Sequence, residues 1–167
     1  VSLLDIAVVK FPHLSNFDDF DPLGRENGVT LKYVESVEEL QRPDLIILPG
    51  SKTTMADLSW MNNQGLTKAI KNLHSSGIPV IGVCGGYQML GTKLYDPEGI
   101  ESNMLEMDGL AILPMTTVFG GTKETHRIQG RVQGNTGLLS RAAGESVTGY
   151  EIHMGRTTGS QVQPAST

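Results

Sequence analysis

Short apolar runs that end in turn residues and alternate with helical patterns constrain this chain most strongly. Within the first half they are LLDIAVV (3–9), VTLKYVES (29–36), DLIILPGS (44–51) and PVIGV (79–83). Between the last two runs, apolar residues recur at helical spacing from Thr53 to about Ser75. Strands that alternate with helices join through right-handed crossovers and form parallel sheets. The sequence therefore predicts an α/β fold with a mainly parallel sheet and helices on both faces.

The pattern changes after Gly99. Three short runs bounded by glycine have the composition of strands, and no helical pattern separates them. They are GLAILPMTTVF, HRIQGRVQG and TGYEIHMG. Such runs favour hairpins, so we expect an antiparallel extension of the sheet after residue 105.

Composition narrows the classes of function. The 167 residues fit a single domain and carry a formal net charge of −5. No cluster of Lys and Arg resembles a phosphate-binding surface, which argues against nucleic acid as a partner. No apolar run approaches the roughly 20 residues of a membrane span. The single cysteine cannot form an internal disulfide, which favours a reducing, cytoplasmic setting.

That cysteine, Cys84, lies in the stretch GVCGG (82–86), between an apolar strand and the helical pattern YQMLG. A nucleophile between small residues at a strand-to-helix junction is typical of a nucleophile elbow, in which a strained turn leaves no room for larger neighbours. A position at a helix N-terminus also favours the thiolate. The alternative is a buried cysteine beside packing glycines.

A second turn is expected to lie near Cys84. The run DLIILPGS ends in Gly50 and Ser51, and the carboxyl ends of parallel strands meet at one edge of a sheet. Backbone N–H groups of this turn, together with that of Gly85, can stabilise a developing oxyanion. The alternative is an ordinary β-turn.

A thiol nucleophile also needs a base. The chain contains four histidines, His13, His74, His126 and His153. His74 follows a helical pattern and is expected on the surface, and His126 is expected to be a solvated residue. His13 lies in the first loop, at the right edge of the sheet but without a motif. Spacing alone favours His153 as the base, against a structural or substrate-lining role.

Four segments resemble one known family. GVCGGYQMLG, PGSKTTMADL, FPHLSNFDDFDPL and GYEIHMGRT are similar, in the same order, to the class I, cobalamin-type glutamine amidotransferase domains of cobyric acid synthases. The resemblance implies a flavodoxin-like fold and a Cys84 that attacks glutamine, forms a thioester and releases ammonia. It implies substrate contacts from Gln88, His153, Gly155 and Arg156. It implies neither a metal site nor a cofactor in this domain.

The resemblance also implies a partner. In such enzymes an N-terminal synthetase domain, with ATP and magnesium, uses the ammonia to amidate carboxylates of a corrin ring. No P-loop motif occurs here, and the family's catalytic histidine lies in a later strand, beyond the position of Thr167. We therefore expect residues 1–167 to be one glutamine amidotransferase domain, truncated at the C-terminus and lacking the N-terminal synthetase domain. His153 is expected in the pocket rather than as the base.

Three alternatives remain open. The chain could be the glutaminase subunit of another amidotransferase, or a thiol hydrolase of the same fold. It could also be a non-catalytic docking or ammonia-channel module. A fast alkylation of Cys84 would argue against the last of these, because a thiolate reacts faster than a buried thiol.

Overall fold

The computed structural model describes residues 3–121, 124–134 and 136–159. Its main sheet is 4-stranded, in the order β2-β1-β3-β4, and every pair in it is parallel. The strands are β1 (Leu4–Val9), β2 (Val29–Val34), β3 (Leu45–Leu48) and β4 (Val80–Gly82). The direction in which successive strands are added to the sheet reverses between β1 and β3. Ligands of open α/β sheets bind at such switch points.

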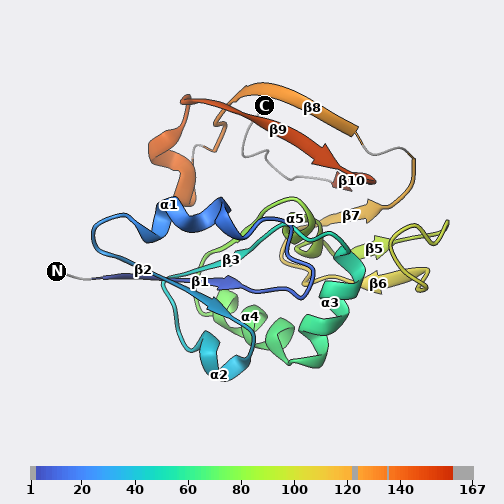
Figure 1. Ribbon diagram of the computed structural model, residues 1–167, viewed down its shortest axis with the longest axis horizontal. Helices are drawn as coiled ribbons and strands as arrows, with labels where there is room; N and C mark the ends of the chain where they lie inside the picture. Colours follow the sequence, from blue (N-terminus) through green and yellow to red (C-terminus); the bar gives the residue numbers. More distant parts are fainter. Residues whose placement is uncertain (1–2, 122–123, 135, 160–167) are drawn as a thin grey trace.

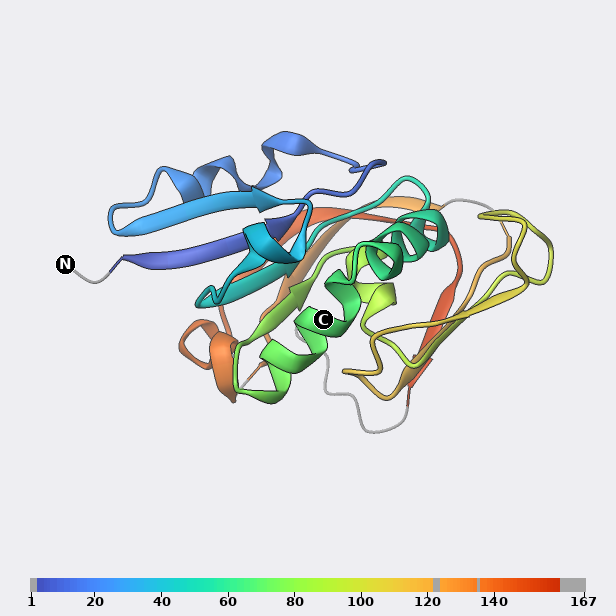
Figure 2. The same ribbon diagram turned by 90° about the horizontal axis from the view of Figure 1, so that it is seen from below.

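Helical segments cover both faces of this sheet, which confirms the predicted fold class (Figures 1 and 2). On one face lie α2 (Val37–Leu40), α3 (Thr54–Asn63) and α4 (Leu66–Ser75). On the other lie the 3₁₀ turn η1 (Phe17–Phe20) and α1 (Asp21–Gly24), whereas α5 (Gly85–Met89) follows β4 directly. The helical span expected from Thr53 to Ser75 is two helices, because Gly65 between them has a left-handed φ of 74°.

The alternation of side chains along the strands builds two cores. Ala7 and Val9 of β1 face the core beneath α3 and α4, where Leu58 and Ile70 are fully buried. Ile6 and Val8, one residue out of phase, face the opposite core with Phe20. Burial of successive residues on both faces explains why β1 has a continuous apolar run.

The remaining strands form separate sheets rather than an extension of the first. A second 4-stranded sheet has the order β10-β7-β5-β6, and its β5–β7 pair is parallel. Its strands are β5 (Lys93–Tyr95), β6 (Glu106–Asp108), β7 (Met115–Val118) and β10 (Arg156–Gly159). Antiparallel pairing therefore begins at residue 93, earlier than the expected residue 105.

A long hairpin arches over the face of the main sheet opposite α3 and α4 (Figures 1 and 2). It pairs β8 (Glu124–Arg131) with β9 (Ser146–His153), and the 3₁₀ turn η2 (Gly137–Ala142) lies between them. Most described residues of the hairpin are exposed. Among the described residues, no helix has the length and apolar character needed to cross a membrane.

Candidate functional site

The elbow around Cys84 has the backbone geometry that its sequence predicts. Cys84 is the residue before α5 and has φ 51° and ψ −113°, a region that side chains rarely adopt. A Cβ on Gly82 would lie 2.6 Å from the Gly86 carbonyl oxygen, and one on Gly86 would lie 2.0 Å from the Leu48 carbonyl oxygen. Only glycine fits at these two positions, which explains the Gly-x-Cys-x-Gly pattern.

The thiol of Cys84 is exposed and lies beneath the hairpin. Its Sγ is 3.3 Å from the carbonyl oxygen of Ile152, to which the thiol donates a hydrogen bond. Ile152 belongs to β9, so a strand that is 68 residues away in the sequence covers the elbow. The interpretation of Cys84 as a buried core residue is thus wrong, while its nucleophilic role stays a prediction.

The turn after β3 lies beside the elbow, as expected. A Cβ built on Gly50 would lie 3.7 Å from Cys84 Cβ. A Cβ built on Gly85 would lie 3.2 Å from the backbone nitrogen of Ser51. The Gly50–Ser51 peptide therefore lies beside the start of α5, where the sequence places the two backbone donors of an oxyanion site.

The Ser51 side chain joins a network that the sequence does not reveal. Its Oγ donates to Asp57 Oδ2 at 2.6 Å, and Asp57 Oδ1 lies 2.8 Å from His13 Nδ1. His13 belongs to the first loop and Asp57 to α3, so three separate segments meet here. Among the described residues, the His13 ring thus contacts Asp57.

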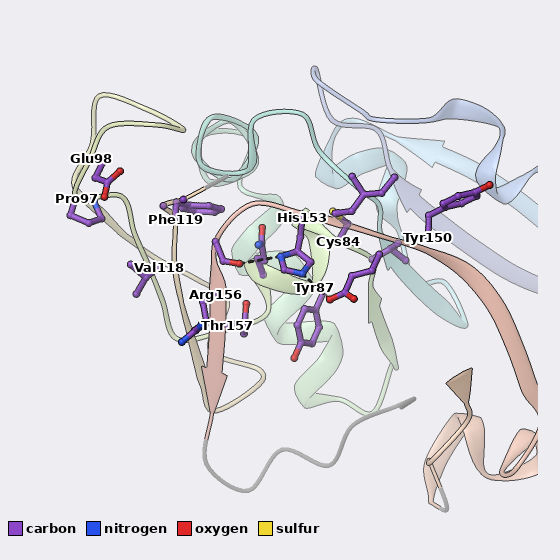
Figure 3. Close-up of a pocket in the computed structure, with 17 residues that line it drawn as sticks. Cys84, Tyr87, Pro97, Glu98, Val118, Phe119, Tyr150, His153, Arg156 and Thr157 are labelled. Atoms are coloured by element: carbon purple, nitrogen blue, oxygen red, sulfur yellow. Dashed lines mark hydrogen bonds and ion pairs between the residues drawn. The ribbon is translucent and has the colours of Figure 1, made fainter. Parts of the chain in front are cut away.

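A pocket of about 1150 Å³ opens in front of Cys84 (Figure 3). Its lining comes from the elbow, the loop after β5, the end of β7, and strands β9 and β10. The lining contains side chains of both charges: Glu98 and Glu151 are acidic, and Arg156 is basic. Figure 3 shows Glu98 at one end of the lining, His153 near its middle and Cys84 beyond it.

The turn between β9 and β10 carries three residues that the resemblance predicts as substrate contacts. These residues, His153, Gly155 and Arg156, all line the pocket. Gly155 has φ 86°, and a Cβ there would lie 2.7 Å from the Val118 carbonyl oxygen. Glycine is therefore needed for the turn to pass close to β7. Nδ1 of His153 lies 3.1 Å from the Gly155 carbonyl oxygen and Nε2 lies 2.9 Å from Glu151, contacts that fix the ring within the turn.

Gln88 also reaches the pocket, but both ends of its side chain are already bonded. Nε2 donates to the Met154 carbonyl oxygen at 3.1 Å, and Oε1 accepts from Thr54 Oγ1 at 3.3 Å. Only 6% of Gln88 is exposed. In this arrangement Gln88 holds the β9–β10 turn against α5.

The loop after β5 is built on a buried carboxylate. Asp96 is fully buried and accepts hydrogen bonds from the backbone N–H groups of Ile100, Glu101 and Ser102. These bonds place Glu101 at the start of α3, where its Oε2 accepts from Thr54 N at 2.7 Å. Burial raises the pKa of Glu101, and the nearby charges of Asp96 and Asp57 raise it further, although bonds from two backbone N–H groups oppose this.

The structure thus gathers Cys84, Gly85, Gly50 and Ser51 at the elbow, and brings Gln88, His153, Gly155 and Arg156 to the adjoining pocket. The other two histidines lie elsewhere: His74 bonds the Ile78 carbonyl oxygen after α4, and His126 is exposed on β8.

Sequence reasoning missed Glu98, Tyr87 and Tyr150, which line the pocket. The position of Tyr87 follows from the sequence, because it lies three residues after Cys84 in the stretch YQMLG. Nothing in the sequence marks Glu98 and Tyr150, because their place in the pocket depends on how the separate sheets pack.

Among the described residues, no group of three or more His, Cys, Asp or Glu side chains is arranged to hold a metal ion. The site instead offers an exposed thiol, the Gly50–Ser51 turn next to the start of α5, and an adjoining pocket with side chains of both charges. Such a set suits attack on a polar, uncharged carbonyl group within a small charged molecule.

Comparison with known proteins places this geometry in a family. Residues 5–167 match the CobB/CobQ-like glutamine amidotransferase domain. The chain is 52% identical to cobyric acid synthase of Moorella thermoacetica over 152 residues, which are 91% of this chain and 29% of that protein. It is 49% identical to cobyric acid synthase of Desulfitobacterium hafniense, over 93% of this chain and 30% of that protein. The chain therefore spans less than a third of the length of these relatives.

Solved structures agree on the fold. The structure of PurLQS from Thermotoga maritima matches 97% of this chain and 73% of that chain, with a TM-score of 0.71 and 20% identity. A crystal structure of a glutamine amidotransferase matches 89% of this chain and 70% of that chain, with a TM-score of 0.61 and 16% identity. With the family match over residues 5–167, this chain belongs to the CobB/CobQ-like glutamine amidotransferase domains.

Proposed function

We propose that this chain is the glutaminase domain of a cobyric acid synthase, and that Cys84 is its nucleophile. One observation carries the proposal: the exposed thiol of Cys84, on a strained elbow, lines a pocket that also contains side chains of both charges. Family membership and about 50% identity to cobyric acid synthases support the same activity.

The chemistry follows from the elbow. The Cys84 thiolate attacks the side-chain carbonyl carbon of glutamine, and the electron pair of the C=O bond moves to oxygen. The N–H groups of Ser51 and Gly85 stabilise this oxyanion. When the oxyanion collapses, the C–N bond breaks, the nitrogen takes up a proton and ammonia leaves. Water then attacks the thioester, which gives glutamate and restores the thiol.

The pocket supplies contacts for the rest of the substrate. The α-carboxylate of glutamine is complementary to the Arg156 guanidinium, and its α-ammonium group is complementary to Glu98 or Glu151. His153 lies on the same lining and is held by Glu151 and the turn carbonyl, so we assign it to substrate contact rather than proton transfer. Gln88 supports the turn that presents these residues.

The remaining parts are proposed to lie in a longer protein. The relatives' greater length leaves room for a synthetase domain with ATP and magnesium, and for the segment that carries the catalytic base. That domain would use the ammonia to amidate corrin carboxylates in cobalamin biosynthesis, in the cytoplasm. The synthetase domain would then be the protein partner of this chain.

The test uses the full-length protein, a corrin carboxylate acceptor, ATP and glutamine labelled with ¹⁵N in the side-chain amide. We expect the label to appear in the amidated corrin. We expect Cys84→Ala to lose glutamine-dependent amidation and to keep amidation from added ammonium salt. Hydrolysis of glutamine without amidation of the corrin would instead favour another amidotransferase. Unchanged glutamine use by Cys84→Ala would refute the role of Cys84.

A further inference from the structure

Asp57 is a carboxylate, fully buried at its side chain, that joins two loops at the edge of the main sheet. Its Oδ2 accepts from Ser51 Oγ at 2.6 Å, whereas its Oδ1 accepts from the His13 backbone N–H at 3.3 Å and lies 2.8 Å from His13 Nδ1. A buried carboxylate is costly unless it is hydrogen-bonded. These bonds therefore tie the first loop and the turn after β3 to helix α3.

Backbone bonds between the loop and the turn set the direction of one peptide group. Ser15 N–H donates to the Gly50 carbonyl oxygen at 3.0 Å, and Lys52 N–H donates to the His13 carbonyl oxygen at 2.8 Å. In a trans peptide the C=O and the next N–H point to opposite sides. With the Gly50 carbonyl turned toward Ser15, the Ser51 N–H points away from the loop. The start of α5 lies next to that nitrogen, 3.2 Å from a Cβ built on Gly85.

The Ser51 hydroxyl locks the same residue from its other end. It donates to Asp57 and accepts from Thr53 N–H at 3.1 Å, so both roles of the oxygen are used. Rotation of the Ser51 backbone would break these bonds and leave one oxygen of the buried Asp57 carboxylate without its hydrogen bond from Ser51. The donor direction of Ser51 N–H is thus fixed before any substrate binds.

We propose that Asp57 is a positioning residue that holds the Ser51 N–H toward the oxygen that becomes negative when Cys84 attacks. This inference rests on the proposed glutaminase function. Asp57 acts through Ser51 and does not touch the substrate. A preoriented donor needs no reorganisation during the reaction, and a displacement of about 1 Å at a reacting group costs roughly 10²-fold in rate.

The test measures glutamine hydrolysis by the full-length protein in Asp57→Asn, Ser51→Ala and the double variant. Asn has the size of Asp, but with a single acceptor oxygen it cannot accept from both Ser51 and His13 as Asp57 does. We expect kcat to fall roughly 10- to 100-fold in each single variant, and the double variant to be no slower than the slower single one. The dissociation constant for glutamine, measured with Cys84→Ala added to each variant, should stay within about threefold, because the oxyanion forms only after attack.

Ile70→Val is the control for lost stability, because it trims a fully buried side chain of α4. It should lower the melting temperature and leave kcat unchanged. Amidation from added ammonium salt should be unchanged in all variants, since it bypasses the elbow. If Asp57→Asn does not fold, Ser51→Ala decides, because it keeps the carboxylate and its contacts with His13.

Three outcomes would overturn the inference. Wild-type kcat in Asp57→Asn or Ser51→Ala would show that the network does not position the donor. Equal losses of glutamine-dependent and ammonia-dependent activity would show a purely structural role. A wild-type protein that hydrolyses no glutamine would remove the proposed function first and this inference with it.

Discussion

The side-chain nitrogen of Gln88 lies 3.1 Å from the carbonyl oxygen of Met154, to which it donates a hydrogen bond. Gln88 is in α5, one helical turn after Cys84, and Met154 is in the turn between β9 and β10. The helix that starts at the nucleophile is therefore joined directly to the turn that carries His153 and Arg156. Thr54 of α3 also contacts Gln88, because its hydroxyl donates a hydrogen bond to the side-chain oxygen of Gln88.

Gln88→Met should loosen this turn. Met has a similar length but cannot donate to the Met154 carbonyl, so the pocket residues His153 and Arg156 lose their support. We expect KM for glutamine to rise about tenfold, which corresponds to about 1.4 kcal/mol of binding, with a smaller change in kcat. Steady-state glutamine hydrolysis by the full-length protein measures both. A fall in kcat alone would contradict this and would place Gln88 in the chemical step.

Cys84→Gly should be more stable than Cys84→Ala. The φ of 51° and ψ of −113° at this position are strained for any residue with a Cβ, and such strain costs on the order of 1–3 kcal/mol. The greater freedom of glycine in the unfolded chain offsets roughly 0.5–1 kcal/mol of this gain. We therefore expect a net difference of about 1 kcal/mol in unfolding free energy, measured by urea denaturation of the two variants.

The matched control for this pair is Ser75→Gly against Ser75→Ala. Ser75 is exposed at the end of α4 and its φ is not positive. Glycine should be the less stable of the two variants there, because it is the poorer helix former. If the glycine variant were the less stable one at position 84 as well, the elbow would hold no strain.

Two parts of the site could be predicted from the sequence: the glycines around Cys84, which local geometry requires, and the turn at Ser51, which follows from sheet topology. Gly82 and Gly86 lie next to Cys84 in the sequence, and the steric need for both arises within the same turn and the strand beside it. The meeting of Ser51 with that turn follows from parallel strands having their carboxyl ends at one edge.

What the sequence could not foretell depends on contacts between distant segments. Asp57 appears in the sequence as an ordinary residue of α3, and only the fold brings His13, 44 residues earlier, to its carboxylate. The strand-like runs after residue 105 predict an antiparallel extension of the main sheet. They form a separate sheet and a hairpin instead, because the partner of a short strand is set by packing and not by its own pattern.

His153→Ala distinguishes a pocket residue from a base. If His153 contacts substrate, as proposed, KM for glutamine should rise with kcat reduced less than about tenfold. Loss of a general base removes typically about 10²–10⁴-fold of the rate. The comparison uses the full-length protein, with the pH profile of kcat recorded for both forms. A loss of 10²-fold or more, together with loss of the acidic limb of that profile, would make His153 the base.

The 167-residue chain offers a second check of the same assignment. If the base lies outside these residues, the isolated chain should react at Cys84 with a glutamine analogue that carries an alkylating group, but hydrolyse glutamine slowly. Mass spectrometry of the labelled peptide and a glutamate assay measure the two reactions. Full glutaminase activity in the isolated chain, lost in His153→Ala, would contradict the proposal.

Glu101 should make the stability of this domain depend on pH in the mildly acidic range. Burial is the largest cause that raises the pKa of Glu101, and Asp96 and Asp57 add to it. A carboxyl whose pKa is higher in the folded than in the unfolded state stabilises the fold when protonated. Its contribution is complete below the unfolded pKa of about 4.3 and is lost as the pH rises through the folded value.

Glu101→Gln should therefore remove this dependence. The amide stays neutral and its oxygen can still accept from Thr54 N–H, so the variant should gain stability relative to wild type as the pH rises from about 4 to about 7. Urea denaturation at several pH values measures the difference, with Glu26→Gln, at an exposed position, as the control that should show no such trend. A difference that instead moves toward wild type with rising pH would mean that the hydrogen bonds from Thr54 and Met55 outweigh the burial of the charge.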